Sequence, residues 1–209
     1  MIDQRLRVIL AAIIVLICGC SSNETIQSVR QPPGASCCKS FDELPFRDIG
    51  RGTSLRVEVD VDTPVFDFPE GKSRFAAFRL APDDKPGRLR IKTSIVGRPL
   101  NLAFVFYPAV TFLNADFRRI QLIEPRLKYD QLGAWIGEVP VPSQTKYAVI
   151  HTPTEKVGTR IYYKEGVTTS SGSVAPAGKT MSYIPGNWWD VYLPAAGVGR
   201  FEIELQSSR

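Results

Sequence analysis

Short stretches in which apolar and polar residues alternate recur along the chain from residue 55 onward. In the first of them, one face carries Leu55, Val57, Val59 and Val61, and the other carries Arg56, Glu58, Asp60 and Asp62. Successive side chains of a strand point to opposite faces, so this pattern predicts a half-buried strand. Residues 75–80, 88–92 and 200–205 repeat the alternation and predict three more strands.

Apolar runs at 102–106, 110–113, 135–136, 146–151 and 161–163 predict further short strands. The run at 102–106 is apolar almost throughout, so either both of its faces are covered or one faces a partner. Gly and Pro punctuate the runs, and residues 83–87 form a strong turn signal. With no long helical period outside the N-terminus, the sequence predicts an all-β fold, an antiparallel, jelly-roll-like β-sandwich.

The N-terminus carries a different signal. Val8–Ile17 is continuously apolar and follows Arg5 and Arg7. This run suits a signal peptide and is short for a membrane-spanning helix, which needs about 20 residues. The following Ile17-Cys-Gly-Cys20 resembles a bacterial lipobox, which implies cleavage before Cys20 and acylation of both its thiol and its new amine. The alternative is an ordinary secreted protein in which Cys20 is coincidental.

These signals divide the chain into three parts. We expect a signal peptide at 1–19, a lipidated N-terminus with a flexible tether at 20–36, and a single β-sandwich domain at 37–209. Ser21 after the lipidated cysteine resembles the sorting signal of outer-membrane lipoproteins, so we expect an outer-membrane lipoprotein that faces the periplasm. Membrane lipid is then a partner through Cys20. The net charge of +5 is spread along the chain, and no nucleic-acid partner is expected.

Two cysteines, Cys37 and Cys38, remain in the predicted domain. An oxidising compartment favours a disulfide. A trans peptide holds neighbouring Cα atoms about 3.8 Å apart, below the usual disulfide range of about 4.4–6.8 Å. A vicinal disulfide, two free thiols and a bond to another chain therefore stay open, and we favour a structural clip over a redox role. The pair and the lone His151 do not match a zinc spacing, so no metal or other cofactor is expected.

The sequence offers little catalytic chemistry. His151, the one histidine, ends an apolar run, which favours a structural or surface role over a catalytic base. Asp60 and Asp62 lie on the same side of the predicted strand and could hold calcium or act as paired acids. A solvated strand face explains them better. No hydrolase or phosphate-binding motif is present, so we expect a non-enzymatic protein with no catalytic residues.

An aromatic cluster near the C-terminus is the strongest ligand-binding signal, and it comprises Tyr183, Trp188, Trp189 and Tyr192. It follows a Gly-, Ser- and Thr-rich segment, residues 165–179, that predicts a surface loop. Aromatic rings stack on the apolar faces of sugars, which makes the four residues candidates for carbohydrate stacking. Because neighbouring strand residues point to opposite faces, we favour core packing for one of the tryptophans.

Four motifs resemble the maltose-operon periplasmic protein family. They are Cys-Cys-x-Ser-Phe-x-x-Leu-Pro-Phe at 37–46, Ser-x-Phe-Ala-Ala-Phe-x-Leu at 73–80, Phe-x-Pro-x-Val-x-Phe-Leu-Asn-x-x-Phe at 106–117 and Tyr-Ala-Val-Ile-His-Thr at 147–152. Some members of the family continue into a helical C-terminal region, which has no counterpart here. The family has no established enzymatic activity and supplies no catalytic residues.

The resemblance implies a periplasmic accessory protein linked to maltose and maltodextrin transport, because the family is often encoded beside those uptake genes. The alternative is a structural or assembly lipoprotein that binds another envelope protein and no sugar.

The lipid anchor can be tested directly. We expect Cys20→Ser to move the protein from the membrane fraction to the soluble fraction, because the acylated thiol and amine are lost. Sedimentation followed by immunoblotting measures the distribution. A Cys20→Ser protein that still sediments with membranes would show that the anchor lies elsewhere.

Overall fold

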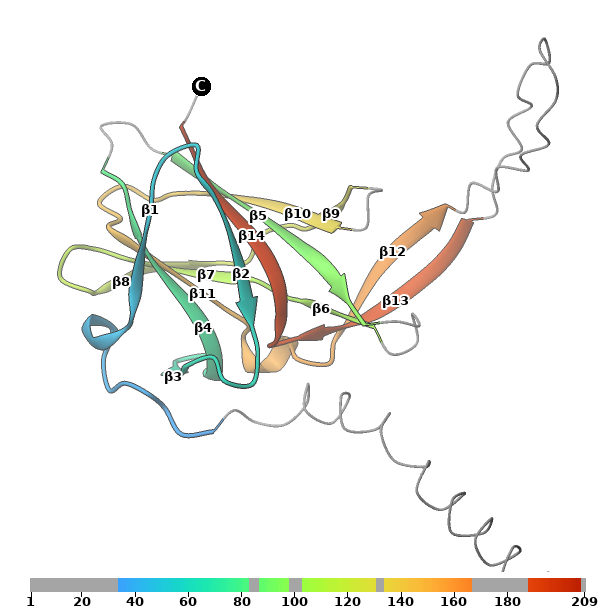
Figure 1. The fold of residues 1–209 in the computed structure, drawn as a ribbon, viewed down its shortest axis with the longest axis horizontal. Helices are drawn as coiled ribbons and strands as arrows, with labels where there is room; N and C mark the ends of the chain where they lie inside the picture. Colours follow the sequence, from blue (N-terminus) through green and yellow to red (C-terminus); the bar gives the residue numbers. More distant parts are fainter. Residues whose placement is uncertain (1–33, 83–86, 98–102, 131–133, 167–187, 208–209) are drawn as a thin grey trace, which may run out of the picture. The chain divides into compact units, whose positions relative to one another are not determined.

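Two β-sheets pack face to face in the part of the chain that the structure describes (Figure 1). This computed structural model describes residues 34–82, 87–97, 103–130, 134–166 and 188–207, and only the backbone of 162–166 and 188–192. The predicted signal peptide, Cys20, Tyr183, most of the 83–87 turn and most of the 165–179 segment lie outside the described residues. Within the described part, no helix is long and apolar enough to cross a membrane.

The first sheet follows the order β1-β4-β11-β7-β8, and β3 pairs with β4 beside this path. Its strands are β1 (Phe46–Ile49), β3 (Val65–Phe68), β4 (Gly71–Leu80), β7 (Ala109–Leu113), β8 (Arg119–Ile123) and β11 (Tyr147–His151).

In the second sheet, β12-β13-β6-β5-β10-β9 are neighbours in this order, while β14 lies between β5 and β2. Its strands are β2 (Ser54–Val59), β5 (Gly87–Val96), β6 (Phe104–Phe106), β9 (Lys128–Tyr129), β10 (Ala134–Pro140), β12 (Arg160–Gly166), β13 (Trp188–Ala196) and β14 (Gly199–Ser207).

The main core lies between the two sheets. The first sheet supplies Ala76, Phe78, Leu80, Val110, Phe112, Ala148 and Ile150, and the second supplies Val57, Val59, Leu89, Ile91, Val139, Phe201, Ile203 and Leu205. Alternation in the sequence assigns the core positions of β2, β4, β5 and β14 to the buried face, whereas β7 and β11 were predicted as apolar runs with no assigned face. The expected all-β sandwich is therefore confirmed, and it rests on the apolar face of each alternating strand.

The first sheet also buries its other face, which we call the outer face. There Phe75, Ala77, Leu113 and Val149 are at most 2% exposed. They pack with Leu44, Phe66, Phe68 and Tyr147 into a second cluster, the outer cluster. All five residues of β7 and all five of β11 are consequently buried, as both-face coverage requires. The segment before β1 and strand β3 supply the cover.

Most neighbouring strands run antiparallel, but two pairs run parallel. These are β1 with β4, and β6 with β13. Parallel neighbours need a crossover connection, and both pairs have one. Between β1 and β4 the chain forms β2 in the second sheet and then β3 in the first sheet. Strand β4 therefore runs in the same direction as β1.

The predicted strand at 55–62 ends earlier than expected. β2 stops at Val59, and Val61 is 61% exposed, so its assignment to the buried face is wrong. The reason is local, because Asp60 Oδ1 accepts hydrogen bonds from the Asp62 N–H at 3.1 Å and the Thr63 hydroxyl at 2.9 Å. Such side-chain bonds compete with a strand ladder.

This turn also changes the interpretation of the two aspartates. Asp60 and Asp62 do not share one side of a strand, and the hydrogen bond from Thr63 lowers the pKa of the Asp60 carboxyl. We assign Asp60 to capping the turn between β2 and β3. The described residues contain no group of three His, Cys, Asp or Glu side chains that could hold a metal ion.

The strand end generates a stability prediction. Val59 is 1% exposed, so Val59→Ala should lower the free energy of unfolding by about 2 kcal/mol, from two lost methyl groups and the cavity they leave. Val61→Ala, the matched control, should change it by less than about 0.5 kcal/mol. Urea unfolding of both variants measures this. Equal losses would mean that the strand continues through Val61.

Candidate functional site

A groove of about 570 Å³ opens on the outer side of the first sheet. It lies between the short 3-10 helix η1 (Phe41–Glu43), strand β3 and the turn that joins β7 to β8. We call it the entrance groove. It is lined by Lys39, Ser40, Phe41, Asp42, Phe66, Asp67, Phe68, Pro69, Asp116 and Phe117. Small-molecule pockets occupy about 300–1,000 Å³, so the groove has the size of a ligand site.

Strand β3 forms the floor of the groove. The rings of Phe66 and Phe68 meet edge to face at 5.0 Å, and both contact Phe75 of β4 with centroids 6.2–6.3 Å away. β3 and β4 form a hairpin that needs Gly71 after its turn, because Gly71 has a φ of +103° and a Cβ there would clash with Thr154. The floor is thus an aromatic layer fixed by the hairpin.

The first wall is the segment that leads into η1. Ser36 Oγ donates a hydrogen bond to Asp67 Oδ2 at 2.6 Å, and the Cys37 N–H donates to the Val65 carbonyl at 2.8 Å. A disulfide joins Cys37 to Cys38, whose Cα atoms are 3.8 Å apart. Half-buried Cys38 packs against the outer cluster, so the bridge sits where the wall is fixed to the domain. This position suits the structural clip favoured from the sequence.

Helix η1 completes the first wall. Its backbone is held by Glu43, whose Oε2 accepts the Lys39 N–H at 2.7 Å, and by Leu44, which is 4% exposed. Phe41 lies against Phe66 with ring centroids 4.9 Å apart and stays half-exposed. The docking of this segment leaves the Phe41 ring partly exposed in the lining of the groove.

The second wall is the turn between β7 and β8. Asn114 Oδ1 accepts the N–H groups of Asp116 at 3.0 Å and Arg118 at 2.8 Å. This places Phe117 in the left-handed region with a φ of 58°. The half-exposed Phe117 ring stacks on Tyr147 at 4.6 Å and 16°. Non-glycine residues in this conformation are uncommon and occur at ligand sites, where the surrounding contacts hold them.

His151 lies beneath the groove and is fully buried. Its ring stacks on Phe68 with centroids 3.7 Å apart, and Nε2 lies 3.0 Å from the Thr111 hydroxyl. Nδ1 has no hydrogen-bond partner in the described part of the chain. Burial, with a smaller contribution from the positive charge of Arg119, lowers its pKa to about 3. The imidazole is therefore neutral at pH 7 and supports the floor, which agrees with the structural role expected for it.

An ion pair joins the turn of the β3–β4 hairpin to β8. Arg119 of β8 lies 2.6 Å from Glu70, which is in the turn between β3 and β4. Both side chains are less than 30% exposed, so this pair is better shielded from water than the other ion pairs of the surface. It links the turn after β3 to β8, which is an edge strand of the first sheet.

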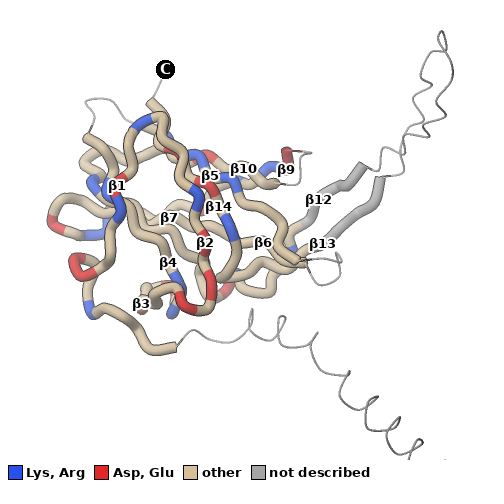
Figure 2. The backbone as a smooth tube through the Cα atoms, viewed as in Figure 1, with Lys and Arg blue, Asp and Glu red and all other residues tan. Residues whose placement is uncertain are grey.

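The outer face of the second sheet is a different kind of surface. Figure 2 shows that both signs of charge occur along β2 and β14, whereas the charged residues of β5 are all basic. Four ion pairs connect the strands of this face: Arg88–Glu138 at 3.6 Å, Arg90–Glu204 at 3.8 Å, Lys92–Asp130 at 3.6 Å and Arg200–Glu58 at 2.9 Å.

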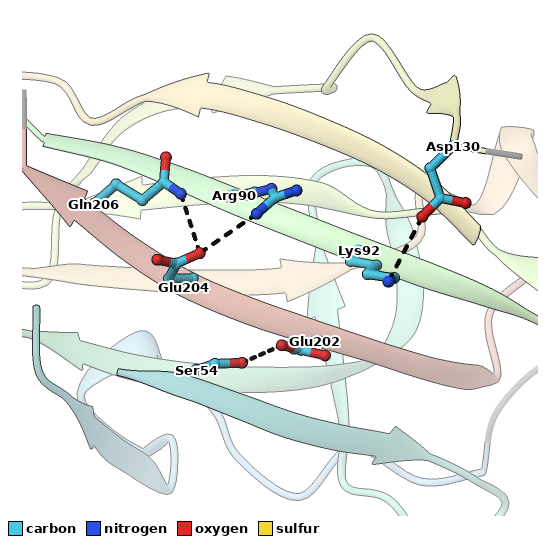
Figure 3. Close-up of polar contacts among 7 residues, drawn as sticks. All are labelled: Ser54, Arg90, Lys92, Asp130, Glu202, Glu204 and Gln206. Carbon is cyan, nitrogen blue, oxygen red and sulfur yellow. Dashed lines mark hydrogen bonds and ion pairs between the residues drawn. The ribbon is translucent and has the colours of Figure 1, made fainter. Parts of the chain in front are cut away.

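Side-chain hydrogen bonds extend this arrangement. Glu204 accepts a bond from Gln206 at 3.0 Å besides its pairing with Arg90, and Ser54 donates to Glu202 (Figure 3). A shallow hollow of about 540 Å³ lies over β2, β14 and β5. Its lining carries three cations, Arg56, Lys92 and Arg200, and two carboxylates, those of Glu58 and Glu202. Exposed ion pairs of the kind found on this face contribute about 0–1 kcal/mol each. The face matches the solvated strand faces predicted from the sequence, so we place the candidate site in the entrance groove.

Neither the comparison with protein-family models nor that with curated proteins finds a match to this chain. The resemblance of the four motifs therefore remains an expectation.

The predicted aromatic cluster lies largely outside the described residues. Tyr183 is not described. Trp188, Trp189 and Tyr192 belong to β13, where their backbone pairs with β12, but their side chains are not described. Carbohydrate stacking by these four residues remains a prediction.

Sequence reasoning missed Phe117 as a site residue. The apolar run predicts a strand at 110–113, and Phe117 appears in the sequence only as an apolar residue of the motif at 106–117. The available signal was Asn114, a residue that forms side-chain-capped turns, followed within three positions by a large aromatic residue.

The buried imidazole generates a pH prediction. The pKa of His151 is about 3 in the folded protein and 6.5 when exposed, so the unfolded chain binds the extra proton. Stability is therefore lost as pH falls from about 6.5 towards 3. Between pH 7.5 and 4.5, we expect the native protein to lose roughly 2–3 kcal/mol more unfolding free energy than His151→Phe, measured by urea unfolding.

Thr111→Val is the control, since it removes the hydrogen bond to His151 but keeps the titrating ring, and it should retain most of the acid dependence. Equal acid losses in the native protein and His151→Phe would contradict a buried neutral imidazole.

Proposed function

We propose that this protein is a non-enzymatic, lipid-anchored accessory protein of the bacterial cell envelope that binds a saccharide in the entrance groove. The anchor and the periplasmic location rest on the lipobox-like Ile17-Cys-Gly-Cys20 and the apolar run before it. The link to maltodextrins rests on the four motifs that resemble maltose-operon periplasmic proteins. The entrance groove supports the proposal further, because it has the volume of a small-molecule site.

The observation that carries the proposal is the pair of half-exposed rings in the groove, Phe41 on one wall and Phe117 on the other. Each ring is held by a second aromatic residue behind it, Phe66 and Tyr147 respectively. Sugar rings present apolar C–H faces that pack on aromatic rings, and an aromatic surface held in place loses little conformational entropy on binding. Carboxylates beside the rings accept hydrogen bonds from sugar hydroxyls.

Calorimetric titration of the full-length protein with maltose and longer maltodextrins tests the proposal. The protein is purified from membranes in a detergent without a sugar head group, because such a head group would compete for the groove. We expect saturable binding. Phe117→Ala and Phe41→Ala should each weaken it about tenfold, which corresponds to about 1.4 kcal/mol, because each removes one stacking surface.

Two sets of variants make the test specific. Ile120→Ala removes a large exposed apolar side chain of β8 outside the groove and should leave the affinity unchanged. Trp188→Ala and Trp189→Ala test the carbohydrate stacking predicted for the aromatic cluster, and they leave the affinity unchanged if the groove is the site. Loss of binding only in the tryptophan variants would move the site to the aromatic cluster of β13. A flat titration of folded protein would instead favour the alternative of a lipoprotein that binds another envelope protein.

A further inference from the structure

We infer that the entrance groove selects uncharged saccharides over anionic ones, and that Asp42 and Asp116 set this preference. The inference rests on the proposed function, since it names the class of saccharide that the same groove takes. It concerns two side chains to which the sequence assigns no role.

The first step is the charge of the lining. Three carboxylates line the groove, those of Asp42, Asp67 and Asp116, against the single ammonium group of Lys39. Asp67 is already engaged, because Ser36 donates to it at 2.6 Å and Lys72 Nζ lies 3.7 Å from its other oxygen. Within the described residues, the carboxylates of Asp42 and Asp116 form no hydrogen bond or ion pair. Both side chains are exposed and therefore available to a ligand.

The second step is the placement of these two carboxylates. Asp42 follows Phe41 in η1, and Asp116 precedes Phe117 in the turn between β7 and β8. Each half-exposed ring thus has a free carboxylate next to it in the chain, on a backbone that is fixed by hydrogen bonds. Because both rings and both carboxylates line the same groove, a saccharide stacked on either phenylalanine would lie in a cavity whose lining carries these carboxylates.

The third step is the chemistry of an ionised carboxylate, which only accepts hydrogen bonds. The hydroxyls of a neutral saccharide are donors and satisfy it with a charge-assisted bond. A phosphate or uronate group is ionised at pH 7 and brings a second negative charge next to the first. Like charges placed together at a binding site act against the wrong ligand, and salt reduces the effect.

Calorimetry with a matched pair of ligands, maltose and maltose 6′-phosphate, tests the inference on the full-length protein in the same detergent. At low salt we expect maltose to bind at least tenfold more tightly. The double variant Asp42→Asn, Asp116→Asn keeps the size of both side chains. It should reduce the ratio of the two dissociation constants severalfold, mainly because maltose 6′-phosphate binds more tightly. Raising the salt concentration should reduce the same ratio of dissociation constants in the native protein, because salt screens the repulsion.

Two control variants separate local from general charge effects. Asp62→Asn removes an equally exposed carboxylate in the turn between β2 and β3, outside the groove, and should leave the ratio unchanged. Lys39→Gln removes the one cation of the groove lining and should increase the preference for maltose over maltose 6′-phosphate. Thermal melting of each variant confirms that it is folded.

The outcomes distinguish the inference from the function beneath it. If neither ligand binds, saccharide binding itself is overturned, and the selectivity with it. If both bind equally, or the phosphate binds more tightly, only the selectivity is overturned. If the double variant leaves the ratio as in the native protein, the preference does not come from Asp42 and Asp116, and their assignment is overturned.

Discussion

The first sheet has two apolar faces, and the rest of the structure depends on covering the second of them. The inner face is buried against the second sheet, as in any β-sandwich. The outer face carries large side chains such as Phe75 and Leu113, and burying each stabilises the fold by about 1.5–3 kcal/mol. No third sheet is available within the described residues. The chain covers this face with the segment before β1 and with β3 folded back as a hairpin.

A cover made of short pieces leaves gaps where the pieces meet, and the entrance groove lies in one of them. Its parts are fixed from below by aromatic contacts and from the side by hydrogen bonds to Val65, Asp67 and Asn114. The left-handed backbone of Phe117 costs about 1–3 kcal/mol and is compensated by the bonds to Asn114 and by the stacking on Tyr147. The same contacts that complete the fold therefore hold the two exposed rings in place.

Period-two alternation was sufficient to predict β2, β4, β5 and β14 and their buried faces, as Leu89, Ile91 and Ile203 illustrate. It failed at Val61, because a side-chain-capped turn at Asp60 ended the strand where the pattern continued. The groove was beyond such reasoning for a different reason. Its two walls come from segments about 75 residues apart in the chain, so only the tertiary fold brings them together, whereas local composition draws attention to neighbouring aromatic residues such as Trp188 and Trp189.

The entrance groove and the outer face of the second sheet also differ in whether their charged side chains already form ion pairs. This difference decides which of the two surfaces suits a ligand. On the outer face of the second sheet, ion pairs such as Arg200–Glu58 hold charged groups against one another across neighbouring strands. A ligand there would have to replace contacts that already exist. In the groove, the carboxylates of Asp42 and Asp116 form no hydrogen bond or ion pair with the described residues and are exposed to solvent water, beside aromatic rings that are also partly exposed. A polyhydroxylated ring can replace that water with hydroxyl donors while it covers the rings, so the groove gains both polar and apolar contacts on binding.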